Sequence, residues 1–176
     1  DRLSAKAMDD RSGCAVLVQM LRELGESPHD VYAVFTTQEE VGTRGALVSA
    51  FGIEPEVALA IDVTDTGDVP EATPIAVDLG AGPAVKVMDR GFLAHSGVKE
   101  WLIDGAERLG IAYQREVLQA GSTDARAIQL TRAGVPTGAL SLPARYIHSP
   151  SEMVDVRDLQ GAVKLLVALL REPITL

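Results

Sequence analysis

Val31-Tyr32-Ala33-Val34-Phe35 is a short, continuous apolar run, and it predicts a buried strand of a core sheet. The charge doublet Glu39-Glu40 follows this run, and a second run, Val57-Ala58-Leu59-Ala60-Ile61, ends directly in Asp62. Carboxylates at the edge of a hydrophobic core repel one another, and removing water from them costs free energy. Because no lysine or arginine lies closer in sequence to the doublet than Arg44, we expect a metal cation there.

Apolar patterns of strand and helix type alternate along the chain. Predicted helices cover Ser12–Leu24, Thr43–Phe51, Ser96–Leu109, a segment from Ser122 or Thr123 to about Ala133, and Val156–Leu170 with Asp155 as its N-cap. Predicted strands cover Val31–Thr36, Val57–Ile61, one or two segments within Ala76–Val87, Tyr113–Leu118 and Gly138–Leu142, with a loop at Thr64–Thr73. This order predicts an α/β fold with a mostly parallel sheet sandwiched by helices.

The composition narrows the possible partners. A chain of 176 residues is expected to form a single domain. Its net charge of −9 argues against nucleic acid and against an anionic membrane surface as partners. Cys14 is the only cysteine, which favours a reducing, cytoplasmic location.

Several polar residues are predicted to meet at one edge of the sheet. Glu39, Glu40, Asp62 and His148 all follow predicted strands, and ligands gather at the carboxyl ends of parallel strands. Each of these residues could instead have an ordinary structural role, as a solvated loop residue or as the cap of a turn. The Asp9-Asp10 pair could likewise be the N-cap of a helix. Together, carboxylate oxygens and an imidazole nitrogen are typical ligands of zinc and related divalent metals.

Seven short segments, in this order and spacing, resemble one enzyme family from end to end of the chain. They are Ala5–Arg11, Phe35–Gly42, Ala60–Thr64, Lys86–Arg90, Gly121–Ala125, Arg145–Pro150 and Glu152–Asp155. The family is that of the TET-type, or glutamyl/deblocking, aminopeptidases, which are cytoplasmic di-metal peptidases often labelled endoglucanases. The resemblance implies a zinc-peptidase-like fold and a peptide substrate that loses its N-terminal residue by hydrolysis.

The resemblance also implies roles for the metal-binding residues. Asp9 would bridge two divalent metals, zinc or cobalt. Glu40 and His148 would complete one metal site with Asp9, and Asp62 would belong to the other.

Other residues receive catalytic and supporting roles from the same resemblance. Glu39 would be the general base that activates water. Asp10 would follow Asp9 across a cis peptide bond and support the site. The substrate pocket would include Gly121, Ser122, Thr123 and Asp124.

The chain departs from the family at one metal ligand. Family members carry an upstream histidine in a His-Thr-Asp segment, whereas the only histidines here are His29, His95 and His148. The chain resembles about half of a full-length member, without the first strands and an inserted dimerisation domain. We therefore expect at most one tightly bound metal, and an upstream segment or another copy of the chain is a candidate partner.

Two other functions compete with the peptidase hypothesis. The missing histidine is also compatible with an inactive fragment or an assembly subunit. A glycoside hydrolase would use paired carboxylates such as Glu39 and Asp62. Sugar-binding sites favour aromatic platforms, and Trp101 is the only tryptophan, on a predicted helix.

Overall fold

A six-stranded mixed β-sheet forms the centre of the protein, in a computed structural model that describes all 176 residues. The strands are β1 Arg2–Ala5, β2 Ala58–Asp65, β3 Ala84–Met88, β4 Gln114–Val117, β5 Thr137–Arg145 and β6 Glu152–Asp155. β2 pairs with β5 and β3 with β4 in parallel, whereas β3–β5, β5–β6 and β1–β6 are antiparallel. The α/β class is therefore confirmed, but the sheet is mixed rather than mostly parallel.

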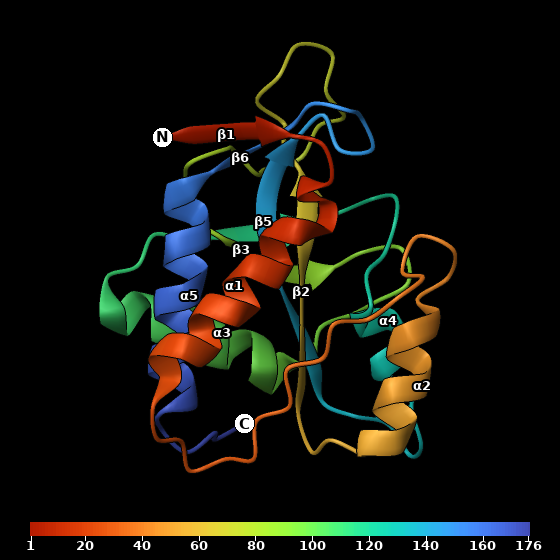
Figure 1. Ribbon diagram of the computed structural model, residues 1–176, viewed down its shortest axis with the longest axis vertical. Helices are drawn as coiled ribbons and strands as arrows, with labels where there is room; N and C mark the ends of the chain where they lie inside the picture. Colours follow the sequence, from red (N-terminus) through yellow and green to blue (C-terminus); the bar gives the residue numbers. More distant parts are fainter.

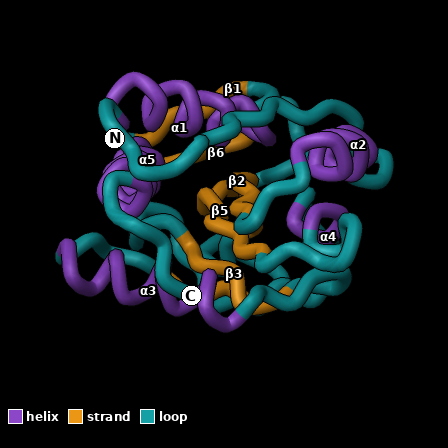
Figure 2. The backbone as a smooth tube through the Cα atoms, turned by 90° about the horizontal axis from the view of Figure 1, so that it is seen from below, coloured by secondary structure: helices purple, strands orange, loops and turns teal.

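Five helices flank this sheet (Figure 1). They are α1 Met8–Leu24, α2 Arg44–Ile53, α3 Ser96–Leu109, α4 Ala125–Ile128 and α5 Val156–Leu170. Helices α1, α3 and α5 gather on one side of the β2–β5 pair, and α2 and α4 lie together on another (Figure 2). None of the helices combines the length and the apolar character that crossing a membrane requires.

Successive side chains of the central strand β5 point to opposite faces of the sheet, and each face has its own core cluster. Leu140 and Leu142 join a large cluster with α1, α3 and α5. Ala139 faces the other way, into a small cluster with Ala60 of β2 and Ala125 of α4. Successive side chains of a strand point to opposite faces, so the small residues allow α4 to approach the sheet closely.

Two predicted elements are wrong or too long. Residues Val31–Thr36 are not part of any strand. The helix predicted to reach Ala133 stops at Ile128, and Arg132, with a positive φ of 53°, follows in turns. The guanidinium of Arg132 lies over the ring of Phe51 and donates to the Phe51 carbonyl, so a contact with α2 overrides the local helical pattern.

The remaining differences concern strand bounds. Strand β2 extends through Thr64 and Asp65, into the predicted loop Thr64–Thr73, and within Ala76–Val87 only the part from Ala84 onward is a strand. The sequence pattern predicts neither β1 nor β6. β1 is exposed along its whole length, and β6 buries the charged residues Glu152 and Asp155, so neither has the apolar pattern that indicates a core strand.

Candidate metal centre

Asp9, Glu40 and His148 bring three potential metal ligands together. Nε2 of His148 lies 3.2 Å from Oδ2 of Asp9 and 3.2 Å from Oε1 of Glu40. One ligand atom from each of the three residues lies within 4.8 Å of the others. Three protein ligands on one side of a cation leave positions for water or substrate, as catalytic zinc sites require.

The fold brings these residues in from three separate segments. Asp9 lies in the first turn of α1, Glu40 in the loop before α2, and His148 in the loop after β5. Because β2 and β5 run parallel, their carboxyl ends lie at the same edge of the sheet. The start of α1 lies beside this edge (Figure 1).

Asp62 lies near this group but is not one of the three convergent ligands. It belongs to β2, opposite Ser141 of β5, and so lies within the strand rather than past its end. Its Oδ1 accepts a hydrogen bond from the Val63 amide at 2.8 Å. Burial raises the pKa of Asp62 to about 6, and the charge of Asp62 in turn raises the pKa of Asp9.

The electrostatics of the group favour a bound cation. Burial, followed by the charges of Asp62 and Glu40, raises the pKa of Asp9 to about 7. Burial and the same kind of repulsion, mainly from Asp62 and Asp124, raise the pKa of Glu39 to about 7. Carboxylates so poorly stabilised by the protein alone are stabilised by a divalent metal. The donor set of two carboxylates and one imidazole also fits zinc or cobalt.

Asp10 is not one of the three convergent ligands and contacts the backbone of α1 instead. Its Oδ1 accepts a hydrogen bond from the Gly13 amide at 2.9 Å. Burial, together with the charge of Asp62, raises the pKa of Asp10 to about 9. The peptide bond between Asp9 and Asp10 is cis, as the resemblance implied.

The segment predicted to line the substrate pocket borders the carboxylate group. Asp124 accepts a hydrogen bond at 2.6 Å from the hydroxyl of Thr36, at the start of the segment that carries Glu39. Ser122 donates to Asp89 at 3.0 Å, Thr123 is buried, and Gly121 has a positive φ of 80° that suits glycine. The negative charge of Asp124 also contributes to the raised pKa of Glu39, so Asp124 interacts electrostatically with the acidic group.

The other two histidines lie in other contacts. Nε2 of His29 is 2.9 Å from the carbonyl oxygen of Glu172 near the C-terminus. His95 is the N-cap residue of α3, and its amide donates to the carbonyl of Thr137. Neither joins Asp9, Glu40 and His148.

The sequence analysis assigned no role to three buried charged residues, Lys86, Glu116 and Glu152. Lys86 of β3 forms a buried ion pair with Glu116 of β4, and Thr64 of β2 donates to the same carboxylate. Glu152 of β6 accepts hydrogen bonds from the backbone amides of Asp9 and His148. Glu152 lies in the family-like segment Glu152–Asp155, four residues after the candidate ligand His148, but the resemblance implied no role for it.

Comparison with known proteins gives consistent matches. The sequence model of the family "M42 glutamyl aminopeptidase" matches residues 1–165. A lysyl aminopeptidase of Pyrococcus furiosus is 38% identical over 172 residues, which are 97% of this chain and 49% of that protein. Among solved structures, the aminopeptidase APDkam598 of Desulfurococcus kamchatkensis has a TM-score of 0.94 and 47% identity, over 98% of this chain and 50% of that one.

A third relative is known as an assembly. The TET1 peptidase of Pyrococcus horikoshii, described as assembling into a tetrahedron or a large octahedral shell, has a TM-score of 0.84 and 33% identity, over 98% of this chain and 51% of that one. The chain thus spans about half the length of the relatives it matches. The match over residues 1–165 shows that this chain belongs to the M42 glutamyl aminopeptidase family.

Proposed function

We propose that this chain carries the metal-binding and proton-transfer residues of a metal-dependent aminopeptidase, which removes N-terminal residues from peptides. The observation that carries the proposal is the convergence of Asp9, Glu40 and His148 on one point, with Glu39 next in sequence to Glu40. Membership of a family of aminopeptidases supports the reaction class. A bound divalent metal would polarise the scissile carbonyl and lower the pKa of water.

Glu39 is the proposed general base. A carboxylate in this role takes a proton from the attacking water and passes it to the leaving amine. Glu39 and Glu40 open a turn, in which the Glu39 carbonyl accepts hydrogen bonds from the amides of Gly42 and Thr43. Only Glu40 of the two joins Asp9 and His148, so Glu40 can bind metal while Glu39 is left to act on water. Burial raises the pKa of Glu39 to about 7, in the range where proton transfer at neutral pH is efficient.

The proposed metal content is one tightly bound ion per chain, held by Asp9, Glu40 and His148. Asp62 and the second oxygen of Asp9 would contribute to a second, weaker site. Two carboxylate residues form a poor zinc site by themselves. The histidine that the family resemblance implies for this second site would come from another segment or polypeptide. Two tightly bound metals per chain would contradict this stoichiometry.

The experiment compares hydrolysis of amino-acid nitroanilides, with added zinc or cobalt, by the wild-type chain and a Glu39→Gln variant. We expect the substitution to lower kcat by about 10²- to 10⁴-fold, the usual contribution of a general base, without changing the metal content. Glu56→Gln, a change of an exposed glutamate, is the matched control. Hydrolysis that does not depend on Glu39 would contradict the assignment.

The inactive fragment is the second candidate, and the histidine content favours it. The three ligands would then bind metal without hydrolysis in the chain alone. A folded, metal-loaded chain that releases no nitroaniline until a polypeptide with the missing histidine is added would support this alternative.

A glycoside hydrolase is disfavoured by the position of the only tryptophan. Trp101 lies on α3 and packs against the large core cluster, so it does not form a sugar platform beside the carboxylates. Release of sugar from a cellulose oligomer would instead support a glycoside hydrolase.

We further propose a homo-oligomer and a cytoplasmic location. The assembly of the Pyrococcus horikoshii relative supports the first. The single free cysteine, Cys14, supports the second. Light scattering of the purified chain tests the oligomeric state.

A further inference from the structure

Glu152 contacts the backbones of two proposed metal ligands with one carboxylate. Its Oε2 accepts a hydrogen bond from the amide of Asp9 at 3.0 Å, and its Oε1 accepts one from the amide of His148 at 2.9 Å. The residue is only 4% exposed. A buried carboxylate is costly unless both oxygens are satisfied, and here the two amides satisfy them.

The sheet explains how one side chain reaches both ligands. Strand β6 pairs with β1, where Glu152 lies opposite Ala5, shortly before α1 begins with Asp9 in its first turn. On its other side β6 pairs with β5, where Met153 lies opposite Arg145, just before the loop that carries His148. Glu152 therefore lies between the two chain segments that deliver the ligands.

Each ligand segment has a backbone feature that is unfavourable by itself. The N-cap residue of α1, Ala7, has a positive φ of 60° and offers no side-chain acceptor to the free amides of the first turn. His148 has a positive φ of 62°, which is unfavourable for a residue other than glycine. The charge-assisted hydrogen bonds of Glu152 offset both deficits, and its negative charge also suits a helix N-terminus.

We propose that Glu152 is a positioning residue, which fixes Asp9 and His148 relative to each other so that their side chains meet on one cation. The inference rests on the proposed metal site, because it assigns Glu152 a role through Asp9 and His148 rather than a contact with the metal. The carboxylate holds the backbone at each ligand, leaving both ligand side chains free to bind. Supporting groups of this kind usually change metal affinity by about 10- to 100-fold.

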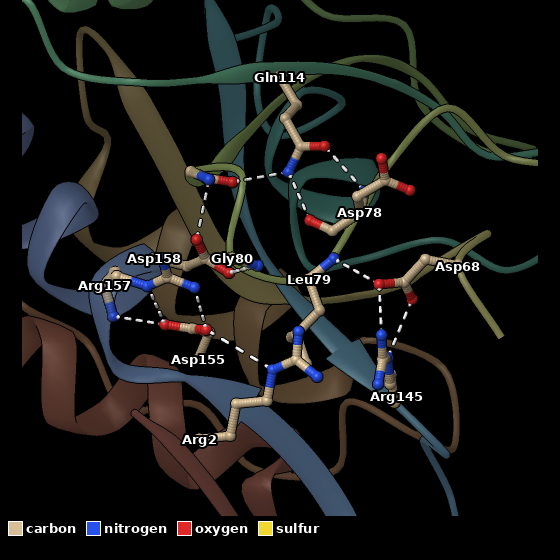
Figure 3. A network of polar contacts seen from close by, with 11 residues as sticks. Arg2, Asp68, Asp78, Leu79, Gly80, Gln114, Arg145, Asp155, Arg157 and Asp158 are labelled. Atoms are coloured by element: carbon tan, nitrogen blue, oxygen red, sulfur yellow. Dashed lines mark hydrogen bonds and ion pairs between the residues drawn. The ribbon is translucent and has the colours of Figure 1, made fainter.

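The test uses Glu152→Gln, which keeps the size of the side chain. A glutamine has one acceptor oxygen, and its NH₂ group faces a backbone donor, so one of the two hydrogen bonds is lost. Asp158→Asn is the matched control. Asp158 is 1% exposed and accepts the amides of Gly80 and Gly82 at 2.8 Å each, in the loop before β3 (Figure 3).

The first measurement is the dissociation constant for Co²⁺, by competition with a chromophoric chelator. We expect Glu152→Gln to weaken Co²⁺ binding by about 10- to 100-fold, whereas Asp158→Asn leaves it unchanged even if its melting temperature falls. Equal Co²⁺ affinity in Glu152→Gln and wild type would overturn the proposal. If Glu152→Gln does not fold, Glu152→Asp, which retracts the carboxylate by one methylene, serves in the same comparison.

The second measurement does not depend on metal. In the metal-free chain, the amide proton resonances of Asp9 and His148 are expected downfield because they donate to a carboxylate. Glu152→Gln should move at least one of them upfield, and Asp158→Asn should move neither. A wild-type chain that binds no Co²⁺ but shows these shifts would refute the metal site while leaving the backbone contacts intact. Amides that do not respond would refute the role of Glu152.

Discussion

The imidazole of His148 and the carboxylate of Asp9 face each other across 3.2 Å, yet their side chains differ greatly in exposure, at 68% and 13%. The histidine thus approaches the acidic group from solvent, whereas Asp9 is part of the protein interior. Folding depends little on an exposed side chain. Metal binding, in contrast, depends on both residues, because each offers one ligand atom.

His148→Asn should therefore separate metal affinity from stability. Asparagine tolerates the positive φ at this position but lacks the imidazole nitrogen that zinc and cobalt prefer. We expect the affinity for Co²⁺ to fall by more than about 10-fold, since even supporting residues have effects of this size. The free energy of unfolding of the metal-free chain should change by less than about 0.5 kcal/mol. Chelator competition and urea unfolding provide the two measurements.

His29→Asn is the control for that experiment. His29 contacts the Glu172 carbonyl and none of the acidic residues of the candidate site, so Co²⁺ affinity should be that of the wild type. If both histidine variants lose the same affinity, the metal does not bind at His148.

The stability of the metal-free chain should fall as the pH rises. The pKa of Asp9 and of Glu39 is raised from near 4 to about 7 in each case, first by burial. A raised pKa means that the folded chain holds its protons more tightly than the unfolded chain. This contribution is fully present below about pH 4 and is lost as the pH passes 7. Urea unfolding in EDTA should give a lower free energy of unfolding at pH 8 than at pH 5, by at least about 1 kcal/mol.

Two further measurements connect this pH dependence to the site. Asp9→Asn removes one of the titrating groups, so the difference between pH 5 and pH 8 should shrink. Added Zn²⁺ should stabilise the wild type more at pH 8 than at pH 5, because metal binds the deprotonated ligands of the folded chain. If the metal-free wild type is as stable at pH 8 as at pH 5, folding does not raise the pKa of these carboxylates.

The parts of the fold that local signals determine were predicted well. Helix α3 covers Ser96–Leu109 and α5 covers Val156–Leu170, as expected, and Asp155 accepts a hydrogen bond from the Arg157 amide as an N-cap. Strands depend on a partner as well as on their own sequence. Val31–Thr36 begins with an apolar run whose exposure alternates in the structure, with Val31 packed against the core and Tyr32 exposed, but no neighbouring strand pairs with it.

In the candidate site, too, residues that belong to sequence motifs could be predicted, whereas contacts that depend on strand pairing could not. Asp9, Glu40 and His148 were chosen because of their motifs, and the geometry brings them together. The contacts of Glu152 depend on the pairing of β6 with both β1 and β5. That pairing joins segments far apart in the sequence and has no local pattern. Supporting residues of a site are therefore harder to predict than its ligands.

Arg145→Lys should destabilise the protein through a partly buried ion pair (Figure 3). Arg145 ends β5 and binds both oxygens of Asp68 at 3.0 and 2.6 Å, with side chains 16% and 19% exposed. This hydrogen bonding lowers the pKa of Asp68 to about 2, so the stabilisation is present above about pH 4 and is lost as the pH falls through 2. Lysine cannot bind both oxygens in this geometry. We expect a loss of about 1–2 kcal/mol at pH 7, or about 2–8 °C in melting temperature.

An exposed ion pair provides the comparison for this loss. Arg108 also binds both oxygens of a carboxylate, that of Glu172, but the side chains are 50% and 55% exposed. Exposed pairs contribute little, so Arg108→Lys should leave the melting temperature nearly unchanged. Equal losses in the two variants would mean that burial does not strengthen the Arg145–Asp68 pair.

The apolar segment Val31–Phe35, which belongs to no strand, should make the isolated chain prone to association. Tyr32 and Val34 are exposed within this segment, at 67% and 36%, and its backbone pairs with no strand. Unpaired backbone groups next to exposed apolar side chains favour pairing between chains, and lysine at such positions opposes it. The double variant Tyr32→Lys, Val34→Lys should therefore remain monomeric at higher concentration in light scattering, with an unchanged melting temperature. Lysines at the exposed α2 residues Leu47 and Val48 control for added charge. If the α2 lysines suppress association equally, added net charge rather than the loss of the exposed apolar side chains of Tyr32 and Val34 is responsible.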